Sequence, residues 1–321
     1  MKRFTRWSVA GLLAMVACGA LAQAWPARPV RMILAFPPGG PTDIVARVLA
    51  QKLTEQLGQQ FVVDNKPGAG GNIGADLAAK APNDGYTIFY NTSAIVINPA
   101  LYGRSGYDPL KEFSPVTLTA AIPLVLVVHP SLPARSMKEF VDLARSRGGQ
   151  INYSSSGNGT ITHLASAMLA AQMGFSAQHV PYKGSAPGLV DLAAGQTQFM
   201  SDTINTALPY VKDGRLRALA VTSLKRSSVL PDLPTFAESG MPGFDAAAWQ
   251  GVVVPAGTPA EIVVRLGSEL NRALGDAGVR ARLAAQGADA LGGSAADYAA
   301  YIRAEMPRWA RAVKESGARA E

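Results

Sequence analysis

Short runs of apolar and β-branched residues alternate with helix-like segments along the first third of the chain. Short β-rich runs cover 30–36 and 61–65, and between them, up to about residue 57, apolar residues recur at the i, i+1, i+4 and i+5 spacing of an amphipathic helix. A second helix pattern covers 71–81, and a third β-rich run covers 87–91. This β-α-β-α-β order predicts a mostly parallel sheet.

A second block of the same kind follows a long β-rich stretch at 116–129, which we expect Pro123 to interrupt. Helices are expected at 136–147 and 160–173, with a β-rich run after each of them. Residues 231–244 are rich in proline and glycine and lack periodicity. The other expected elements are strands at 151–154, 177–180, 198–201, 216–222 and 249–255, helical segments at 187–194 and 208–213, and helices at 259–274, 277–286 and 295–316.

Two α/β blocks joined by β-rich passages predict an α/β fold with two lobes connected by crossing strands. We expect lobe 1 to comprise residues 25–124 and 246–321, and lobe 2 to comprise residues 125–245. Ligands of open α/β sheets bind at the carboxyl ends of the strands. This rule places the ligand in the cleft between the lobes.

Residues 1–24 have the features of a secretory signal peptide. A basic start is followed by the apolar run 9–16, which is too short to span a bilayer, and then by the A-x-A cleavage site Ala22-Gln23-Ala24. Cleavage predicts a periplasmic protein that begins at Trp25 and lacks Cys18, the single cysteine. The alternative is a lipoprotein processed at Cys18, because the sequence up to that residue faintly resembles a lipoprotein cleavage box.

The chain has 321 residues, 48% of them hydrophobic, which is enough for two domains with cores of their own. Its formal net charge of +7 falls to +4 in the mature chain, because the signal peptide carries three basic and no acidic residues. A mild basic excess suits an anionic small ligand, and without a Lys/Arg cluster it does not indicate nucleic-acid binding. No later apolar run approaches about 18 residues, so we expect no membrane-spanning helix in the mature chain.

The first candidate site is the turn Pro37-Pro38-Gly39-Gly40, which follows the first strand and precedes a helix expected to begin near Thr42. A glycine turn exposes main-chain N–H groups, and the start of a helix carries partial positive charge, so the two together predict an anion site. Thr42 or Asp43 is expected to cap the helix. The alternative is an ordinary connection between a strand and a helix.

Two further glycine stretches precede helices. The spacing in residues 65–74 matches neither a dinucleotide fingerprint nor a P-loop, and we interpret Lys66 as a solvated loop charge. In residues 153–163 a strand ends in serines, passes two glycines and opens a helix at Thr160. Its hydroxyls and N–H groups suit a carboxylate, although the same residues can be simple helix caps. His163, in the first turn, either faces the cleft or is a buried structural residue.

Other strand ends carry further candidates, namely Ser93 after the strand 87–91, the turn 182–185, and Asp202-Thr203. Signals for an enzyme are weak. The chain has no G-x-S-x-G elbow, and its three histidines and one cysteine show no H-x-x-H or C-x-x-C spacing. We therefore expect no catalytic residue, no metal site and no cofactor.

These motifs resemble the Bug family of periplasmic solute receptors, the binding subunits of tripartite tricarboxylate transporters. The resemblance implies a two-lobed, type II-like periplasmic-binding-protein fold and a small carboxylate ligand held mainly by main-chain groups and bridging waters. Alanine is common in the family where this chain has Pro38, which lacks an N–H and so removes one possible donor. The motifs that carry the resemblance are Phe36-Pro-Pro-Gly-Gly-Pro-Thr-Asp43, Asn65-Lys-Pro-Gly-Ala-Gly-Gly-Asn-Ile-Gly74, Pro82-Asn-Asp-Gly-Tyr86, Ser156-Gly-Asn-Gly-Thr-Ile-Thr-His163, Val180-Pro-Tyr-Lys-Gly184 and Trp249-Gln-Gly-Val-Val-Val-Pro-Ala-Gly-Thr-Pro259.

No arginine lies in the glycine stretches, so main-chain N–H groups and hydroxyls, rather than a guanidinium clamp, are the expected donors. The expected donors are the N–H groups of Gly39, Gly40 and Gly159 and the hydroxyls of Ser156 and Thr160. The candidate ligand-binding residues are Pro38, Gly39, Gly40, Asp43, Ser93, Ser156, Gly159, Thr160, His163, Tyr182, Gly184 and Asp202. The expected partners are the carboxylate and the integral-membrane transporter subunits, and the receptor itself is expected to be a monomer. A sensory receptor and a serine-using periplasmic enzyme are the alternative functions.

Overall fold

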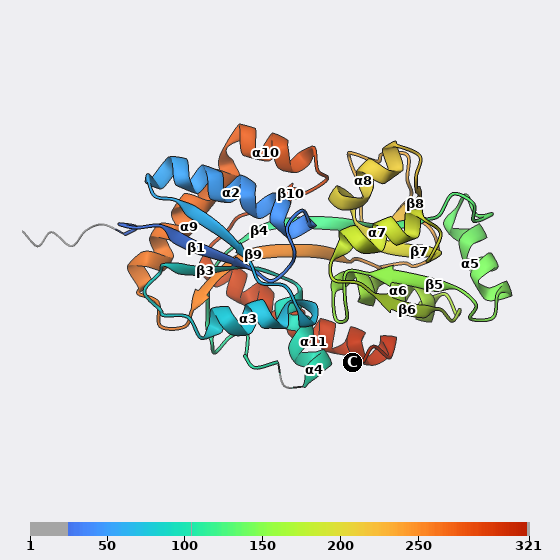
Figure 1. Ribbon diagram of the computed structural model, residues 1–321, viewed down its shortest axis with the longest axis horizontal. Coiled ribbons are helices and arrows are strands. Elements are labelled where there is room, and N and C mark those ends of the chain that lie inside the picture. The colour runs from blue at the N-terminus through green and yellow to red at the C-terminus, as the bar shows by residue number, and fades with distance from the viewer. Residues whose placement is uncertain (1–24, 104, 320–321) are drawn as a thin grey trace, which may run out of the picture.

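The computed structural model describes residues 25–103 and 105–319, and it is an elongated molecule with two parts side by side (Figure 1). The expected signal peptide, with Cys18, lies outside the described residues. The first part opens with β1 (Val30–Leu34), α2 (Pro41–Leu57), β2 (Phe61–Asn65), the 3-10 turn η2 (Ala69–Gly71), α3 (Asn72–Ala79), β3 (Thr87–Thr92) and α4 (Ala94–Tyr102). The second part follows β4 (Phe113–Val128) and contains α5 (Met137–Ser146), β5 (Asn152–Ser155), α6 (Ile161–Gln172), β6 (Gln178–Pro181), α7 (Ser185–Ala193), β7 (Phe199–Thr203), α8 (Ile204–Lys212) and β8 (Arg217–Val221). The chain then returns through β9 (Ala247–Pro255) to α9 (Ala260–Gly275), α10 (Ala277–Ala284), β10 (Asp289–Ala290) and α11 (Ala295–Ser316).

The strands form one ten-stranded sheet in the order β2-β1-β3-β9-β4-β7-β5-β6, with β8 and β10 also paired to β4. β1 is parallel to β2 and β3, and β5 is parallel to β6 and β7. β9 lies antiparallel between β3 and β4. Each part therefore has a parallel group of strands, and the α/β class predicted from the sequence is confirmed.

β4 connects the two parts as one continuous strand. Pro123 pairs with Ala247 of β9, and the next residue, Leu124, pairs with Thr203 of β7. The predicted interruption at Pro123 is wrong, because a proline removes only its own N–H from the ladder and here it stands where the strand changes partners. The lobe boundaries expected at 124/125 and 245/246 lie beside this change of partners, and the division into lobes stays a prediction.

The C-terminal helix α11 packs against α4 and β4 and also against α6, so it contacts both parts of the molecule. The buried carboxylate of Glu305 accepts hydrogen bonds from the indole N–H groups of Trp249, at 3.0 Å, and Trp309, at 2.7 Å. Its other oxygen accepts a hydrogen bond of 2.9 Å from Arg308. Burying a carboxylate is costly unless it is hydrogen-bonded, and these donors satisfy the group at the junction of α11 with β9.

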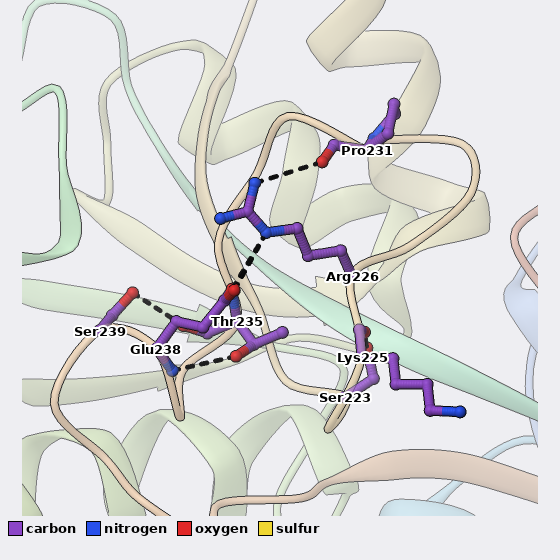
Figure 2. Close-up of polar contacts among 7 residues, drawn as sticks. All are labelled: Ser223, Lys225, Arg226, Pro231, Thr235, Glu238 and Ser239. Carbon is purple, nitrogen blue, oxygen red and sulfur yellow. Dashed lines mark hydrogen bonds and ion pairs between the residues drawn. The ribbon is translucent and has the colours of Figure 1, made fainter.

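The long segment between β8 and β9, without periodicity in the sequence, is held by a small polar network (Figure 2). The guanidinium of Arg226 lies 3.1 Å from the Glu238 carboxylate. Glu238 and Thr235 also bond reciprocally, since the Thr235 N–H donates to the carboxylate and the Glu238 N–H donates to the Thr235 hydroxyl. Ser239 donates to the Thr235 carbonyl. The network closes this turn beside Phe236, which is buried in the core and packs on Phe244.

Local signals explain the ends of several helices. Ser136 caps α5 by accepting from the Glu139 N–H, and Ser294 and Asp297 form a capping box at the start of α11. α2 ends at Gly58, whose φ of 68° suits glycine. Two elements, α4 and β10, were not predicted. Among the described residues, no helix is long and apolar enough to cross a membrane.

Candidate ligand-binding cleft

A cavity of about 600 Å³, including its open mouth, lies between the two parts of the molecule. Its lining combines apolar side chains with hydroxyls and one carboxamide. The lining residues are Phe36, Pro37, Pro38, Gly40, Pro41, Thr42, Thr92, Ser93, Ala94, Ser156, Thr160, Ile161, Thr162, Lys183, Gly184, Ser185, Ala186, Pro187, Thr203, Ala248 and Gln250.

Five helices begin at this cavity. The starts of α2, α4, α6 and α7 lie in its lining, and so does Thr203, the residue before α8. Each helix start presents unpaired N–H groups and partial positive charge. Among the described lining residues none is acidic, and Lys183 is the one charged side chain. The cavity is therefore built to receive negative charge or strong hydrogen-bond acceptors.

The turn between β1 and α2 differs from the prediction in its cap. The helix begins at Pro41, Gly40 is the N-cap residue, and no side chain caps the helix. The expectation that Thr42 or Asp43 is the N-cap is wrong, because the fixed φ of Pro41 already suits the first helical position. Asp43 instead accepts hydrogen bonds from the Gly39 N–H, at 3.0 Å, and from Arg47, at 2.8 Å.

Asp43 is a structural residue of the turn. Burial favours its protonated form, but its hydrogen bonds, above all the one from Arg47, outweigh burial and hold the pKa of Asp43 below its ordinary value. Asn65 supports the same carboxylate at 3.1 Å and also donates to the Phe36 carbonyl at 2.9 Å. The second glycine stretch, which Asn65 opens, thus fixes the shape of the first.

The turn between β5 and α6 is closed by hydroxyl groups. Thr160 caps α6 by accepting from the His163 N–H, and its hydroxyl donates to the Gly157 carbonyl at 2.7 Å. The hydroxyl of Thr162 lies 2.9 Å from those of both Ser156 and Thr160. The sequence left capping and ligand contact as alternatives for Thr160, and the structure shows that Thr160 caps the helix and also lines the cavity.

Four of the five expected donors have partners within the protein, since the Ser156 hydroxyl also lies 2.9 Å from that of Thr162. The Gly39 N–H donates to Asp43, and the Gly159 N–H donates to Nδ1 of His163 at 3.3 Å. The Thr160 hydroxyl proton is directed at Gly157. These groups are not the free donors that we expected, because nearby side chains and the Gly157 carbonyl compete for them.

His163 is buried, and its ring stacks on that of His179 with the centroids 3.8 Å apart. It does not line the cavity, so the structural alternative for this residue is the one observed. Burial lowers the pKa of His163 to about 4, and burial together with the neighbouring His163 lowers the pKa of His179 to about 3. Both rings are neutral at physiological pH.

Ser155 of the serine run and His179 form the pair that the hypothesis of a serine-using enzyme would select as nucleophile and base. The Ser155 hydroxyl lies 2.6 Å from Nε2 of His179. Ser155 is fully buried, however, and is not among the residues that line the cavity. A histidine with a pKa of about 3 is also a weak general base. The pair supports the turn beneath the cavity rather than nucleophilic attack.

Asp202 and Tyr182 lie behind the cavity wall. Asp202 is fully buried and accepts hydrogen bonds of 2.7 Å from Ser185 and from Thr206. Burial raises the pKa of Asp202 to about 6. The Tyr182 hydroxyl donates to Asp191 at 2.6 Å. Both residues position α7, whose first residues line the cavity.

The structure divides the candidate residues into two groups. Six of them line the cavity, namely Pro38, Gly40, Ser93, Ser156, Thr160 and Gly184. The other six, Gly39, Asp43, Gly159, His163, Tyr182 and Asp202, are not among the lining residues. The sequence analysis missed the lining residues Thr92 and Gln250, whereas Thr162, Lys183, Ser185 and Thr203 lie in segments that it named. A polar Gln250 in the apolar run 249–255 was a signal that could have revealed one of them.

The two parts touch at several points. Asn205 donates to the Pro41 carbonyl at 3.4 Å, and a Cβ on Gly184 would lie 3.3 Å from the Pro37 ring. A Cβ on Gly70 would clash with the Asn158 carbonyl oxygen. Glycine at these positions lets the main chains approach closely across the cavity.

Lys66 lies apart from the cavity and pairs with Asp64 at 3.1 Å. Within the described ranges, no group of histidine, cysteine, aspartate or glutamate side chains could hold a metal ion.

Comparisons with known proteins agree with this geometry. A family model described as the tripartite tricarboxylate transporter family receptor matches residues 45–318. Protein BugT of Bordetella pertussis is 38% identical over 314 residues, which cover 97% of this chain and 95% of BugT. The structure of R. palustris Rpa4515 with adipate has a TM-score of 0.89 at 40% identity and covers 92% of this chain and 99% of that chain. MatC from Rhodopseudomonas palustris with bound malate has a TM-score of 0.85 at 32% identity and covers 90% of this chain and 100% of that chain.

Proposed function

This chain belongs to the tripartite tricarboxylate transporter receptor family, and from that premise we propose that it captures a small carboxylate in its cleft and delivers it to the membrane subunits of such a transporter. The resemblance to the Bug receptors and the periplasmic-binding-protein fold predicted from the sequence are confirmed. The protein is a solute-binding receptor of this family. We propose its ligand, its partners and its localisation.

The observation that carries the proposal is the convergence of five helix starts on one cavity whose described lining has no acidic residue. Hydrogen bonds to a charged acceptor contribute roughly 1.5–3 kcal/mol each, and a helix start contributes roughly 0.3–1 kcal/mol more. A few such contacts support micromolar affinity, about −8 kcal/mol, after the costs of binding are met. The adipate and malate of the two related structures are both carboxylates.

Three further features complete the proposal. The residues at the start of the chain direct it to the periplasm, where it acts as a monomer. It acts by binding and release rather than by catalysis, because the Ser155–His179 pair is buried outside the cavity lining. Membership of the family favours release to a transporter over release to a signalling partner.

Titration calorimetry on the mature chain tests the proposal directly. We expect succinate, malate or adipate to bind with micromolar affinity, and the corresponding primary diamide to bind at least tenfold more weakly, because N–H donors then face a neutral acceptor. Equal affinity for the acid and the diamide, or no binding of any of the three acids, would overturn carboxylate capture. Reconstitution with the membrane subunits in vesicles then separates transport from sensing, because only a transport receptor accelerates uptake.

A further inference from the structure

Gln250 is a fully buried polar residue whose side chain belongs to the cavity lining. It lies on β9 directly opposite Thr92 of β3, and both residues line the cavity together with Ala248. Successive side chains of a strand point to opposite faces. Trp249 accordingly points the other way and donates to Glu305 of α11. Gln250 therefore lies on the floor of the cleft, and the hydrogen bond of Trp249 to Glu305 fixes the same strand from its opposite face.

Two hydroxyl groups fix the Gln250 residue at both its side chain and its main chain. The Tyr90 hydroxyl donates to the carboxamide oxygen of Gln250 at 2.9 Å, and the Thr119 hydroxyl donates to its main-chain carbonyl at 2.9 Å. Burial raises the pKa of Tyr90 far above its ordinary value, so this phenol keeps its proton. The carboxamide oxygen is thereby held on the side of Tyr90.

The nitrogen of the same carboxamide has no hydrogen-bond partner among the described residues, although it is buried. A buried donor without a partner costs about 1–3 kcal/mol, and such groups are rare in folded proteins. The start of α4 lies beside it, since Thr92, Ser93 and Ala94 also line the cavity. An unpaired N–H₂ group next to a helix start is a second place for an acceptor, separate from the turns at the starts of α2 and α6.

We infer that Gln250 is a specificity-determining residue that donates to a second carboxylate of the ligand, so that the receptor selects dicarboxylates over monocarboxylates. The inference rests on the proposed function, because it assigns one end of the proposed carboxylate ligand. One carboxylate lies at the helix starts near the mouth, and the other lies on the floor against Gln250 and α4. The apolar residues between them, among them Pro41, Ile161 and Pro187, face the carbon chain.

The experiment compares matched probes on matched variants by titration calorimetry. Succinate, malate and adipate are tested on the unaltered mature protein, and the one that binds best is paired with a monocarboxylate of equal chain length, such as hexanoate for adipate. We expect the dicarboxylate to bind at least tenfold more tightly. Gln250→Met keeps the length of the side chain and removes its N–H donors, so it should weaken the dicarboxylate at least tenfold and change the monocarboxylate less than twofold.

Two further variants sharpen the result. Gln250→Glu places a carboxylate against that of the ligand and should weaken the dicarboxylate more than Gln250→Met does. Tyr90→Phe removes only the hydroxyl that orients the carboxamide, and it should weaken binding of the dicarboxylate less than Gln250→Met does. Retained binding of the monocarboxylate shows that each variant is folded, and the monoamide of the chosen dicarboxylate tests the same contact on the unaltered protein.

The outcomes separate this inference from the proposed function. If the unaltered protein binds none of the three dicarboxylates, both are overturned. If it binds them but Gln250→Met keeps the preference for the dicarboxylate, only the role of Gln250 is overturned. If Gln250→Glu strengthens binding, the side chain accepts a hydrogen bond from the ligand instead of donating one, and the inference is again wrong.

Discussion

The imidazole rings of His163 and His179 stack with an interplanar angle of 6° beneath the turn between β5 and α6, which contributes residues to the cleft. The stack continues to the ring of Tyr153, whose centroid is 5.0 Å from that of His179. Nδ1 of His163 accepts from the Gly159 N–H, and Nε2 of His179 lies 2.6 Å from the Ser155 hydroxyl. The shape of the turn thus depends on two neutral rings.

The first prediction is that stability falls as the pH is lowered below about 6.5, the ordinary pKa of histidine. The folded-state pKa values of about 4 for His163 and about 3 for His179 lie below that value, so the unfolded chain binds more protons in this range. For His163 the loss between pH 6.5 and pH 5 is about 2 kcal/mol. Urea unfolding at a series of pH values measures it.

A variant of His163 tests whether this residue causes the dependence of stability on pH. Asp202 acts in the opposite direction, because its pKa of about 6 makes the folded protein bind the extra proton between about pH 4 and pH 6. The measurement therefore compares how steeply the free energy of unfolding changes with pH, and His163→Gln should make this slope smaller. Equal slopes for the unaltered protein and His163→Gln would contradict the prediction.

The second prediction concerns Thr160. Thr160→Val removes the cap of α6 and the hydrogen bond to the Gly157 carbonyl. We expect about 1 kcal/mol of lost stability from the cap, and ligand binding weaker by about 1–3 kcal/mol because the turn loses its shape. Thr160→Ser keeps the hydroxyl and should keep both properties. Calorimetry showing unchanged affinity in Thr160→Val would mean that the turn holds its shape without this hydroxyl.

The third prediction separates two lysines. Lys183 lines the cavity and is exposed, whereas Lys66 pairs with Asp64 outside it. Lys183→Met should weaken anion binding by roughly 0.2–1 kcal/mol, the range of exposed charge interactions, and less at high salt. Lys66→Met should change affinity little. If Lys66→Met abolished binding, the site would be a lysine clamp in a place other than this cleft.

The fourth prediction is that closure of the cleft depends on Gly70. Gly70→Ala places a methyl group against the Asn158 carbonyl across the cleft and should hold the two parts apart. The left-handed backbone at Gly70 itself costs an alanine roughly 1–2 kcal/mol, so the matched control is Gly214→Ala, with a φ of +69° and open space around it. We expect ligand binding to bring the two parts together and so to decrease the radius of gyration. Only Gly70→Ala should weaken ligand binding and abolish this decrease. Small-angle scattering measures this decrease, and the same decrease in both variants would contradict the prediction.

Much of the fold was predictable because most elements repeat their hydrophobic pattern at one period. β2 and α11 were predicted with the bounds that the structure gives. α4 was missed because it is apolar on nearly all sides and contains Pro99, so it has neither the polar face nor the uninterrupted pattern of an amphipathic helix. β4 was expected to break at Pro123, because the sequence does not reveal that the partner strand changes there.

The site was predictable as a set of segments but not as a set of contacts. The strand ends at 37–43 and 156–160 were recognised because glycine turns before helices have a local signature. The sequence did not reveal that groups of the protein itself occupy donors in these turns, because Asp43 and His163 accept hydrogen bonds that depend on side-chain direction. Gln250 was missed for a different reason: its partner Tyr90 is 160 residues away in the sequence.

The position of β9 decides the order in which the protein can assemble. β9 completes the sheet between β3 and β4, and it is supplied by residues that are synthesised after the whole second part. Until Ala247–Pro255 have emerged, β3 has an unpaired edge and the first part lacks its central partner. Contacts between segments so distant in sequence form slowly. A newly made chain therefore stays incompletely folded until β9, which ends at residue 255 of 321, is present.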